Sequence, residues 1–243
     1  MTTGLINKYG PWVSGEQFFD REAELKHLIG LLDEGNSILI VAPRRVGKTS
    51  LVHEAFRRME VRGRDDLLFV DVQDCSSPQD VIVSLSLAAQ PYKHLWTKVA
   101  DTFAVFFKQV ESVQIPDILG IKLREGLTGD WQAKGQTILH NLSQTDKPLT
   151  ICLDELPIML SRLLQPTTSE TYPSKRAAAD VFLSWLRQMM LQHQDKLRFI
   201  VCGSIGLEPI LKRHRLSHTI TQLRPFPLEP WNRETAVSCL NAL

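Results

Sequence analysis

The sequence predicts an α/β fold built on a mostly parallel five-stranded sheet with helices on both faces. Short apolar runs alternate along the chain with longer segments of helical spacing, an alternation typical of parallel sheets. The first apolar run leads through a loop with a Gly-Lys-Thr sequence directly into a helix, and the third ends on two adjacent acidic residues. The 243 residues are 43% hydrophobic and 23% charged, which is the composition of a globular protein with one large domain or two small ones.

The elements follow in order. The expected strands are residues 37–41, 67–72, 149–153, 197–202 and 219–223. The expected helices are residues 20–33, a helix starting near 49, and residues 77–90, 92–111, 130–145, 177–193, 207–214 and 233–243, the last capped by Asn232. Residues 113–129 mix isoleucine with proline and glycine and are expected to form a short hairpin or irregular insertion, and residues 165–174 are expected to form a loop.

A phosphate-binding loop is predicted between the first strand and the following helix. Residues 42–49 match the pattern G-x-x-x-x-G-K-[ST] except at Ala42, where the pattern has glycine. Pro43 favours an extended conformation at Ala42, which does not require glycine. Backbone N–H groups and the helix dipole would hold a phosphate, Lys48 would reach the β- and γ-phosphates, and Thr49 would bind Mg²⁺. The alternative interpretation of residues 42–49 is a basic turn that precedes a core helix and binds no phosphate.

Asp154 and Glu155 directly follow a buried strand, a Walker B pattern. The strand would hold both carboxylates beside the phosphate loop, where Asp154 would orient Mg²⁺ and Glu155 would activate the attacking water. The alternative is a pair of acidic residues that interact with the dipole of a helix N-terminus. Ser204 ends the next strand, where related ATPases keep a polar sensor of the γ-phosphate, but it is equally suited to cap the helix that follows.

Several arginines could take part in phosphate chemistry. Arg44 and Arg45 lie at the tip of the phosphate loop. An arginine finger could come from another chain, and Arg162, Arg176 and Arg213 are candidates that the sequence does not rank. Two basic runs, residues 57–64 and 212–215, could meet nucleic-acid phosphates, but solvated helix ends explain them more simply.

Charge and composition favour an ordinary cytoplasmic protein. The net charge is +1, so bulk charge does not indicate nucleic-acid or membrane binding. No apolar run reaches the length of a membrane span, and no secretory signal pattern opens the chain. The four cysteines form no metal-binding pair, and Cys152 and Cys202 are expected to be buried thiols.

These motifs together resemble the archaeal-type ATPases of the STAND class, which are relatives of the AAA+ ATPases. The segment 19–25, Phe-Asp-Arg-Glu-Ala-Glu-Leu, resembles the N-terminal signature of that family. Residues 43–50, Pro-Arg-Arg-Val-Gly-Lys-Thr-Ser, are similar to the phosphate loop of the family. Residues 153–157 are similar to its Walker B segment, and residues 202–204 are similar to its sensor. The likeness extends from about residue 18 to residue 231.

The resemblance implies a strand order of 5-1-4-3-2, with ATP at the carboxyl ends of the strands and Arg21 near the adenine. It implies an ATPase core over residues 1–228, including an N-terminal helical segment (1–35) and the insertion at 113–129. Residues 229–243 would then begin a helical lid that the sequence cuts short. The nucleotide ligands would be residues 43–50 (Pro43, Arg44, Arg45, Val46, Gly47, Lys48, Thr49 and Ser50), Arg21 and Ser204.

The sequence therefore predicts a Mg-ATP-binding and ATP-hydrolysing protein with Lys48 and Glu155 as catalytic residues and Thr49 and Asp154 as Mg²⁺ ligands. It would act as a regulated switch that controls assembly or a partner module, with slow turnover if another subunit or protein supplies an arginine. One alternative is an ATP-dependent DNA-associated loader or mobile-element regulator. The other is a nucleotide-gated scaffold that does not hydrolyse ATP.

Overall fold

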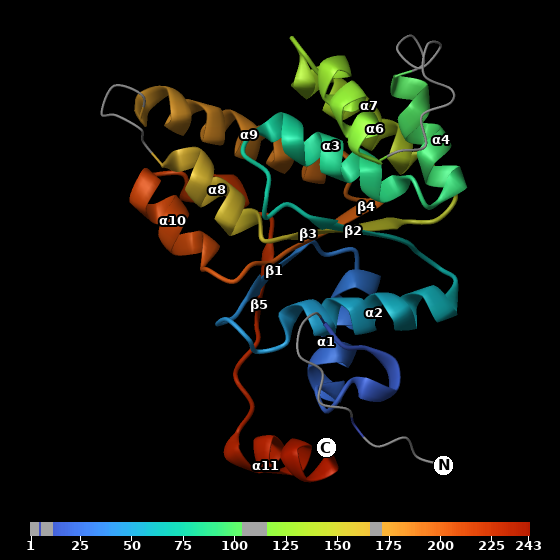
Figure 1. Cartoon of the computed structure of the whole chain (residues 1–243), viewed down its shortest axis with the longest axis vertical. Helices are drawn as coiled ribbons and strands as arrows, with labels where there is room; N and C mark the ends of the chain where they lie inside the picture. Colours follow the sequence, from blue (N-terminus) through green and yellow to red (C-terminus); the bar gives the residue numbers. More distant parts are fainter. Residues whose placement is uncertain (1–4, 6–11, 104–115, 166–171) are drawn as a thin grey trace.

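The computed structural model describes residue 5 and residues 12–103, 116–165 and 172–243. A five-stranded sheet, in which every pair of neighbouring strands is parallel, lies at the centre (Figure 1). In spatial order the strands are β2 (Asp66–Asp71), β3 (Leu149–Asp154), β4 (Leu197–Val201), β1 (Ile38–Val41) and β5 (Arg224–Pro227). Read from the other edge this is 5-1-4-3-2, so the predicted fold class and strand order are confirmed.

Helices cover both faces of the sheet (Figure 1). One face carries α1 (Glu22–Asp33) and α2 (Lys48–Arg62). The other face, with the layer outside it, carries α3 (Pro78–Ala89), α4 (Lys93–Thr102), α6 (Pro116–Gly126), α7 (Trp131–Ser143), α8 (Leu156–Leu164), α9 (Tyr172–Gln192) and α10 (Leu207–His214). Two short 3-10 helices, η1 (Gly15–Gln17) and η2 (Ser217–Ile220), and the C-terminal α11 (Arg233–Ala242) complete the described chain.

Strand β3, which lies between β2 and β4, contributes to both cores, and all six of its residues are buried. Ile151 belongs to the core on the α9 side, whereas the next residue, Cys152, belongs to the core under α1 and α2. This alternation is the two-residue period of a strand that is covered on both faces. The carboxyl end of β3, where Asp154 lies, is therefore held in place from both sides.

Three helices begin at capping side chains where the sequence predicts a helix start. Ser77, Asp130 and Asn232 each accept a hydrogen bond from the backbone N–H three residues further on, at 3.3, 3.0 and 2.8 Å. Each bond satisfies one of the N–H groups that a helix start leaves without an intrahelical acceptor.

The predicted fifth strand was placed wrongly. Residues 219–223 belong to η2 and the turn after it, and β5 is Arg224–Pro227. The backbone N–H of Arg224 donates to the carbonyl of Ser37, just before β1, and that of Leu228 donates to the carbonyl of Val41 at the end of β1. Alternate residues face that neighbour, so the backbone nitrogens of Pro225 and Pro227 face the open edge of the sheet, where their lack of an N–H costs no hydrogen bond.

The predicted hairpin or irregular insertion at residues 113–129 is also wrong where the structure describes it, because residues 116–126 form helix α6. Leu119, Leu123 and Leu127 are buried at helical spacing. A Cβ at Gly120 would lie 3.7 Å from a methyl of Leu87 on α3, an ordinary van der Waals contact, so α6 packs against α3 here. Pro116 stands at the first position of the helix, where proline is tolerated.

Two further boundaries differ from the prediction. Helix α4 ends at Thr102, and most of the remainder of the predicted helix 92–111 lies outside the described residues. Helix α9 begins at Tyr172, within the predicted loop 165–174, of which residues 166–171 lie outside the described part.

The C-terminal helix α11 extends away from the sheet (Figure 1), and none of its residues is buried. Val237, Leu240 and Leu243 are exposed. The division into a core (1–228) and the start of a lid (229–243) remains a prediction.

Candidate functional site

The predicted phosphate loop connects β1 to α2 at the carboxyl edge of the sheet. Gly47 has a φ of 87° immediately before the first helical residue, a conformation that side chains other than glycine rarely adopt. Arg45 also has positive φ, at 62°. Arg44 and Arg45 are exposed and line the cavity beside the loop, while Ala42 packs partly against the core of α1 and α2.

The Lys48 ammonium is held inside its own loop. Lys48 is buried, with 6% of its surface exposed, and its Nζ donates to the carbonyl oxygen of Pro43 at 2.8 Å. A buried ammonium needs hydrogen-bond acceptors, and this loop offers one carbonyl. The remaining donors of Nζ are available to an anion in the cavity that Lys48 lines.

Thr49 and Asp154 meet at the start of α2 and the end of β3. The Thr49 hydroxyl donates to Asp154 Oδ2 at 3.1 Å, although the two residues lie 105 positions apart. The second Asp154 oxygen accepts from the backbone N–H of Glu155 at 3.0 Å and from the thiol of Cys202 at 3.1 Å. Burial raises the pKa of Asp154, with the charge of Glu155 acting in the same direction and the Cys202 and Thr49 hydrogen bonds opposing it.

This pair fits Mg²⁺. Hydroxyl and carboxylate oxygens are ligands that Mg²⁺ prefers, and the ion usually takes one or two protein carboxylates together with water and substrate phosphates. A cation here would offset the cost of burying the ionised Asp154. In the described ranges, no group of three or more His, Cys, Asp or Glu side chains is placed to hold a metal ion by itself.

Glu155 and Ser204 are in direct contact. Glu155 Oε2 accepts from the backbone N–H of Ser204 at 2.7 Å and from its hydroxyl at 2.9 Å. Glu155 stands just before α8 with a φ of 61°, a strained conformation for this residue type. A Cβ on Gly203 would lie 2.6 Å from Cδ of Pro157, so this glycine allows the end of β4 to approach the start of α8.

One cavity of about 1320 Å³ brings the predicted catalytic and metal-binding residues together. Lys48, Thr49, Asp154, Glu155 and Ser204 all line it. Sequence reasoning missed Asp71 and Gln73, which reach the same cavity from the end of β2. The available signal was the place of both residues at the carboxyl end of a strand, where the side chains of a parallel sheet converge.

A second cavity of about 320 Å³ lies on the other side of the phosphate loop. From the N-terminal segment (residues 12–18), Val13, Gln17 and Phe18 line it. Phe19, the phosphate-loop residues Val46 and Gly47, and Trp231, Cys239 and Leu243 near the C-terminus line it as well. Most of the lining side chains are apolar. The cavity has the chemistry of a pocket for a flat, apolar group next to a phosphate site.

Arg21 supports the wall of this second cavity. Only 6% of Arg21 is exposed, and its guanidinium donates to Glu24 Oε1 at 2.7 Å, to the Val46 carbonyl at 3.3 Å and to the Glu229 carbonyl at 2.7 Å. It also lies 5.7 Å from the ring centroid of Trp231. Arg21 therefore joins α1, the phosphate loop and the segment before α11, and most of its donors are already used within the protein.

The three arginine-finger candidates occupy different places. Arg162 lines the 1320 Å³ cavity, donates to the carbonyl of Gln73 and lies 3.5 Å from Asp74. Arg176 donates to two backbone carbonyls at the end of α10. Arg213 is exposed on α10. Of the three, only Arg162 faces the cavity of the phosphate loop.

The two basic runs differ in how their charges are balanced. In the run 57–64, Arg57, Arg58 and Arg62 form ion pairs with acidic side chains, whereas the exposed Arg64 has none with a described residue. In the run at the end of α10, Lys212, Arg213 and Arg215 are exposed and have no ion pair with any described residue. Cations at a helix C-terminus are favoured by the helix dipole alone.

The comparisons with known proteins concern the fold. No family model and no curated protein sequence matches the chain. Among solved structures, it is similar to the Walker-type ATPase PABY2304 of Pyrococcus abyssi, with a TM-score of 0.57 and 16% identity over 96% of this chain. The chain has the α/β fold of P-loop ATPases. The similarity to the Orc1 protein of Aeropyrum pernix, solved in complex with DNA, has a TM-score of 0.54 at 15% identity over 92% of the chain.

The Orc2 protein of Aeropyrum pernix, solved as ADPNP-ADP complexes, gives a TM-score of 0.54 at 16% identity over 97% of this chain. The chain spans 60%, 49% and 53% of the length of these three proteins. Within the described residues, no helix combines the length and apolar character that crossing a bilayer requires.

Proposed function

We propose that this chain binds ATP with Mg²⁺ at the phosphate loop, hydrolyses it, and works as a regulated conformational switch of the STAND type. The observation that carries the proposal is the contact of Thr49 with Asp154 at 3.1 Å beside the buried ammonium of Lys48. This contact brings together a phosphate-binding cation and two oxygen ligands for Mg²⁺, and few functions other than nucleotide binding need this combination.

The binding steps follow from the positions of these side chains. The N–H groups of the phosphate loop and the Lys48 ammonium would hold the β- and γ-phosphates. Thr49 and Asp154 would hold Mg²⁺, which when bound neutralises charge on the phosphate oxygens. The apolar 320 Å³ cavity on the other side of the loop would take the base.

Glu155 would act as the general base that accepts the proton of the attacking water. Ser204 now donates its hydroxyl proton to Glu155. A hydroxyl has one proton to donate, so donation to a phosphate oxygen would release this hold on the carboxylate. In this way the same serine would report the γ-phosphate and free the base, which is the switch that we propose.

Calorimetry and phosphate release test the proposal. We expect Mg-ATP to bind the intact chain, Lys48→Ala to abolish binding, and Glu155→Gln to keep binding while the hydrolysis rate falls by roughly 10²- to 10⁴-fold. The absence of Mg-ATP binding by folded wild-type protein would refute it. A Glu155→Gln protein that retains full partner function, while Lys48→Ala loses it, would instead favour the non-hydrolysing scaffold.

We further propose that the site is completed by an arginine from a second copy or a partner protein. The support is that Arg162 is the one finger candidate at the cavity, and its guanidinium is already bound to the loop after β2. Hydrolysis per molecule should therefore rise with protein concentration. A constant rate per molecule would show that the site is complete within one chain.

A second candidate function is ATP-dependent association with DNA. Lys212, Arg213 and Arg215 favour it, because these exposed cations have no ion pair with the described residues. DNA affinity that falls steeply with salt, with a shallower slope when the three are replaced by alanine, would support it. Arg62→Ala, which removes an exposed arginine paired with Asp33, is the matched control.

A further inference from the structure

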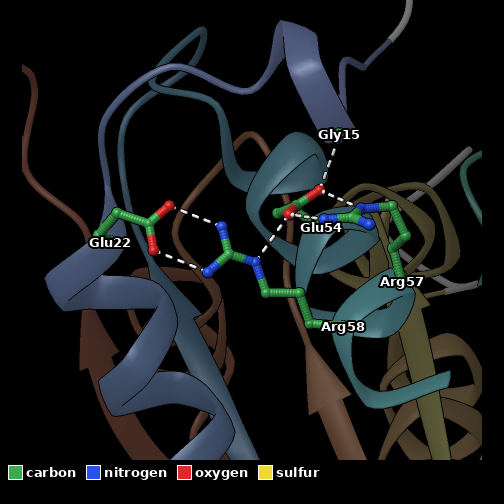
Figure 2. Close-up of polar contacts among 5 residues, drawn as sticks. All are labelled: Gly15, Glu22, Glu54, Arg57 and Arg58. Carbon is green, nitrogen blue, oxygen red and sulfur yellow. Dashed lines mark hydrogen bonds and ion pairs between the residues drawn. The ribbon is translucent and has the colours of Figure 1, made fainter. Parts of the chain in front are cut away.

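Helix α2 contains a buried carboxylate that the phosphate chemistry does not use. Glu54 is 1% exposed and accepts four hydrogen bonds: from the Gly15 N–H at 2.7 Å, from Arg57 Nε and Nη2 at 2.9 and 2.7 Å, and from Arg58 Nε at 2.8 Å. Figure 2 shows Arg58 between two acidic side chains, with its outer nitrogens on Glu22 of α1. Both oxygens of Glu54 are thus fully engaged.

The hydrogen bond from the Gly15 N–H distinguishes this network from the usual ion pairs between side chains of one helix. Arg57 and Arg58 lie three and four residues after Glu54, the usual spacing of ion pairs on one helix. Gly15 belongs instead to the N-terminal segment, 39 residues away in the chain. A shared carboxylate therefore fastens the N-terminal segment to α2.

Two more contacts fasten the same segment along the same face of α2. The Val13 N–H donates to the hydroxyl of Ser50 at 3.1 Å, and the Trp12 ring stacks on His53 with centroids 3.7 Å apart. Ser50, His53 and Glu54 follow the i, i+3, i+4 spacing of a single helix face. Because α2 begins at Lys48, the helix that follows the phosphate loop also carries these three anchors of the segment.

The fastened segment is one wall of the 320 Å³ cavity. Val13, Gln17 and Phe18 line it together with Val46 and Gly47 of the phosphate loop. The position in which α2 holds the segment therefore contributes to the shape of the cavity. The Gly15 bond lies between the lining residues Val13 and Gln17, so Glu54 fixes the middle of this wall.

We infer that Glu54 is a positioning residue for base recognition: it holds the N-terminal segment against α2 so that the cavity beside the phosphate loop takes the base of a nucleoside triphosphate. The inference rests on the proposed nucleotide binding and deepens it. Glu54 touches neither phosphate nor base. It determines how much the base adds to the affinity that the phosphates alone provide.

Comparing two ligands isolates this role. Inorganic tripolyphosphate offers the phosphate loop a triphosphate without a base, so the ratio of its dissociation constant to that of ATP, both with Mg²⁺, measures base recognition. Wild-type protein should bind ATP more tightly. In Glu54→Ala the affinity for ATP should fall by about tenfold while that for tripolyphosphate changes by less than about twofold.

Two further variants complete the experiment. One is a control, and the other releases the N-terminal segment from α2 by a different contact. Glu22→Ala removes the outer partner of Arg58 and leaves the Gly15 bond in place, so both affinities should stay at the wild-type values. His53→Ala removes the ring on which Trp12 stacks and so releases the same segment at another anchor, and His53 lines neither the 320 Å³ nor the 1320 Å³ cavity. It should lower the ratio in the same direction as Glu54→Ala, and it carries the test if Glu54→Ala does not fold.

The outcomes separate the inference from the proposed function. Equal loss of ATP and tripolyphosphate affinity in the folded variants, or no loss at all, would overturn the role of Glu54. Wild-type protein that binds both ligands equally would overturn base recognition at this cavity and leave the phosphate site intact. Binding of neither ligand would overturn the proposed function itself.

Discussion

Ser204 holds the carboxylate of Glu155 with two hydrogen bonds, one from its backbone N–H at 2.7 Å and one from its hydroxyl at 2.9 Å. The two residues follow the carboxyl ends of the neighbouring strands β3 and β4, so the contact joins the two strand ends at the edge of the sheet where the phosphate loop lies. The sequence left Ser204 open between a sensor and a helix cap. No side-chain cap bond from it to α10 is present, and its hydroxyl is directed to Glu155.

Ser204→Ala should therefore lower the rate of hydrolysis rather than the affinity for nucleotide. Alanine keeps the backbone N–H that bonds to Glu155 and removes only the hydroxyl. Misplacing a catalytic group by a small distance costs roughly 10²-fold in rate, so we expect a fall of about ten- to a hundredfold in kcat. Phosphate release gives the rate and calorimetry the affinity for Mg-ATP. An affinity that falls as far as kcat would place Ser204 in ground-state binding instead.

Thr49→Val should remove the contribution of Mg²⁺ to nucleotide binding. Valine has nearly the shape of threonine but lacks the oxygen that contacts Asp154 at 3.1 Å. With EDTA present, wild-type and variant protein should bind ATP alike. With Mg²⁺ present, the wild-type affinity should rise and the variant affinity should rise less. Thr49→Ser, which keeps the hydroxyl, is the control, and a variant with an undiminished Mg²⁺ effect would show that Thr49 is not a ligand.

Gly203→Ala should destabilise the protein and slow hydrolysis. The new methyl would lie 2.6 and 2.8 Å from two carbons of Pro157 and 3.3 Å from Glu155 Oε2, so α8 or the end of β4 must shift. Overpacking of this kind costs about 1–3 kcal/mol of unfolding free energy. Gly30→Ala is the matched control, because no atom lies within 4 Å of the new carbon in α1. It should stabilise the helix by about 0.5–1 kcal/mol. Equal melting temperatures for the two variants would contradict the close approach.

The sequence predicts the fold correctly because the elements give local signals, and the residues proposed for the phosphate site are brought together by the same contiguous elements. Strand β3 and the acidic pair at its end are contiguous in the sequence, and so are β1, the phosphate loop and α2. The errors fell where tertiary context overrides local pattern. Proline at 225 and 227 argued against a strand, yet an edge strand accepts it.

The second cavity and its support could not be predicted, because they depend on segments that are distant in sequence. Arg57 and Arg58 were interpreted as part of a basic run, and the i, i+3 and i, i+4 spacing from Glu54 was an available signal that they are paired. Nothing in the sequence indicates that the N–H of Gly15 shares that carboxylate. That contact arises from packing.

His53 should make stability depend on pH in a defined window. Burial lowers the pKa of His53 to about 4 from its ordinary value of 6.5. Its ring lies between Trp12 and Phe69, and its buried Nε2 has no hydrogen-bond partner in the part of the chain that the structure describes. The folded state therefore favours the neutral ring, and the unfolded state binds more protons between pH 6.5 and 4. Stability should fall as pH falls through that range.

His53→Phe tests this window, because phenylalanine keeps a flat ring between the two aromatic residues and cannot take up a proton. Melting temperatures at intervals from pH 8 to pH 4 should show a smaller decrease for the variant than for the wild type below about pH 6.5. Burial also lowers the pKa of His193 and His214, so part of the decrease should remain in the variant. Glu54 affects stability at lower pH. Burial by itself would raise its pKa, but the hydrogen bonds from Arg57, Gly15 and Arg58 lower the pKa to about 2. The stability that ionised Glu54 contributes is lost only as pH falls from about 4.5 towards 2, which is below most of the pH range in which His53 titrates. Parallel pH profiles for wild type and His53→Phe would show that this ring does not titrate with unfolding.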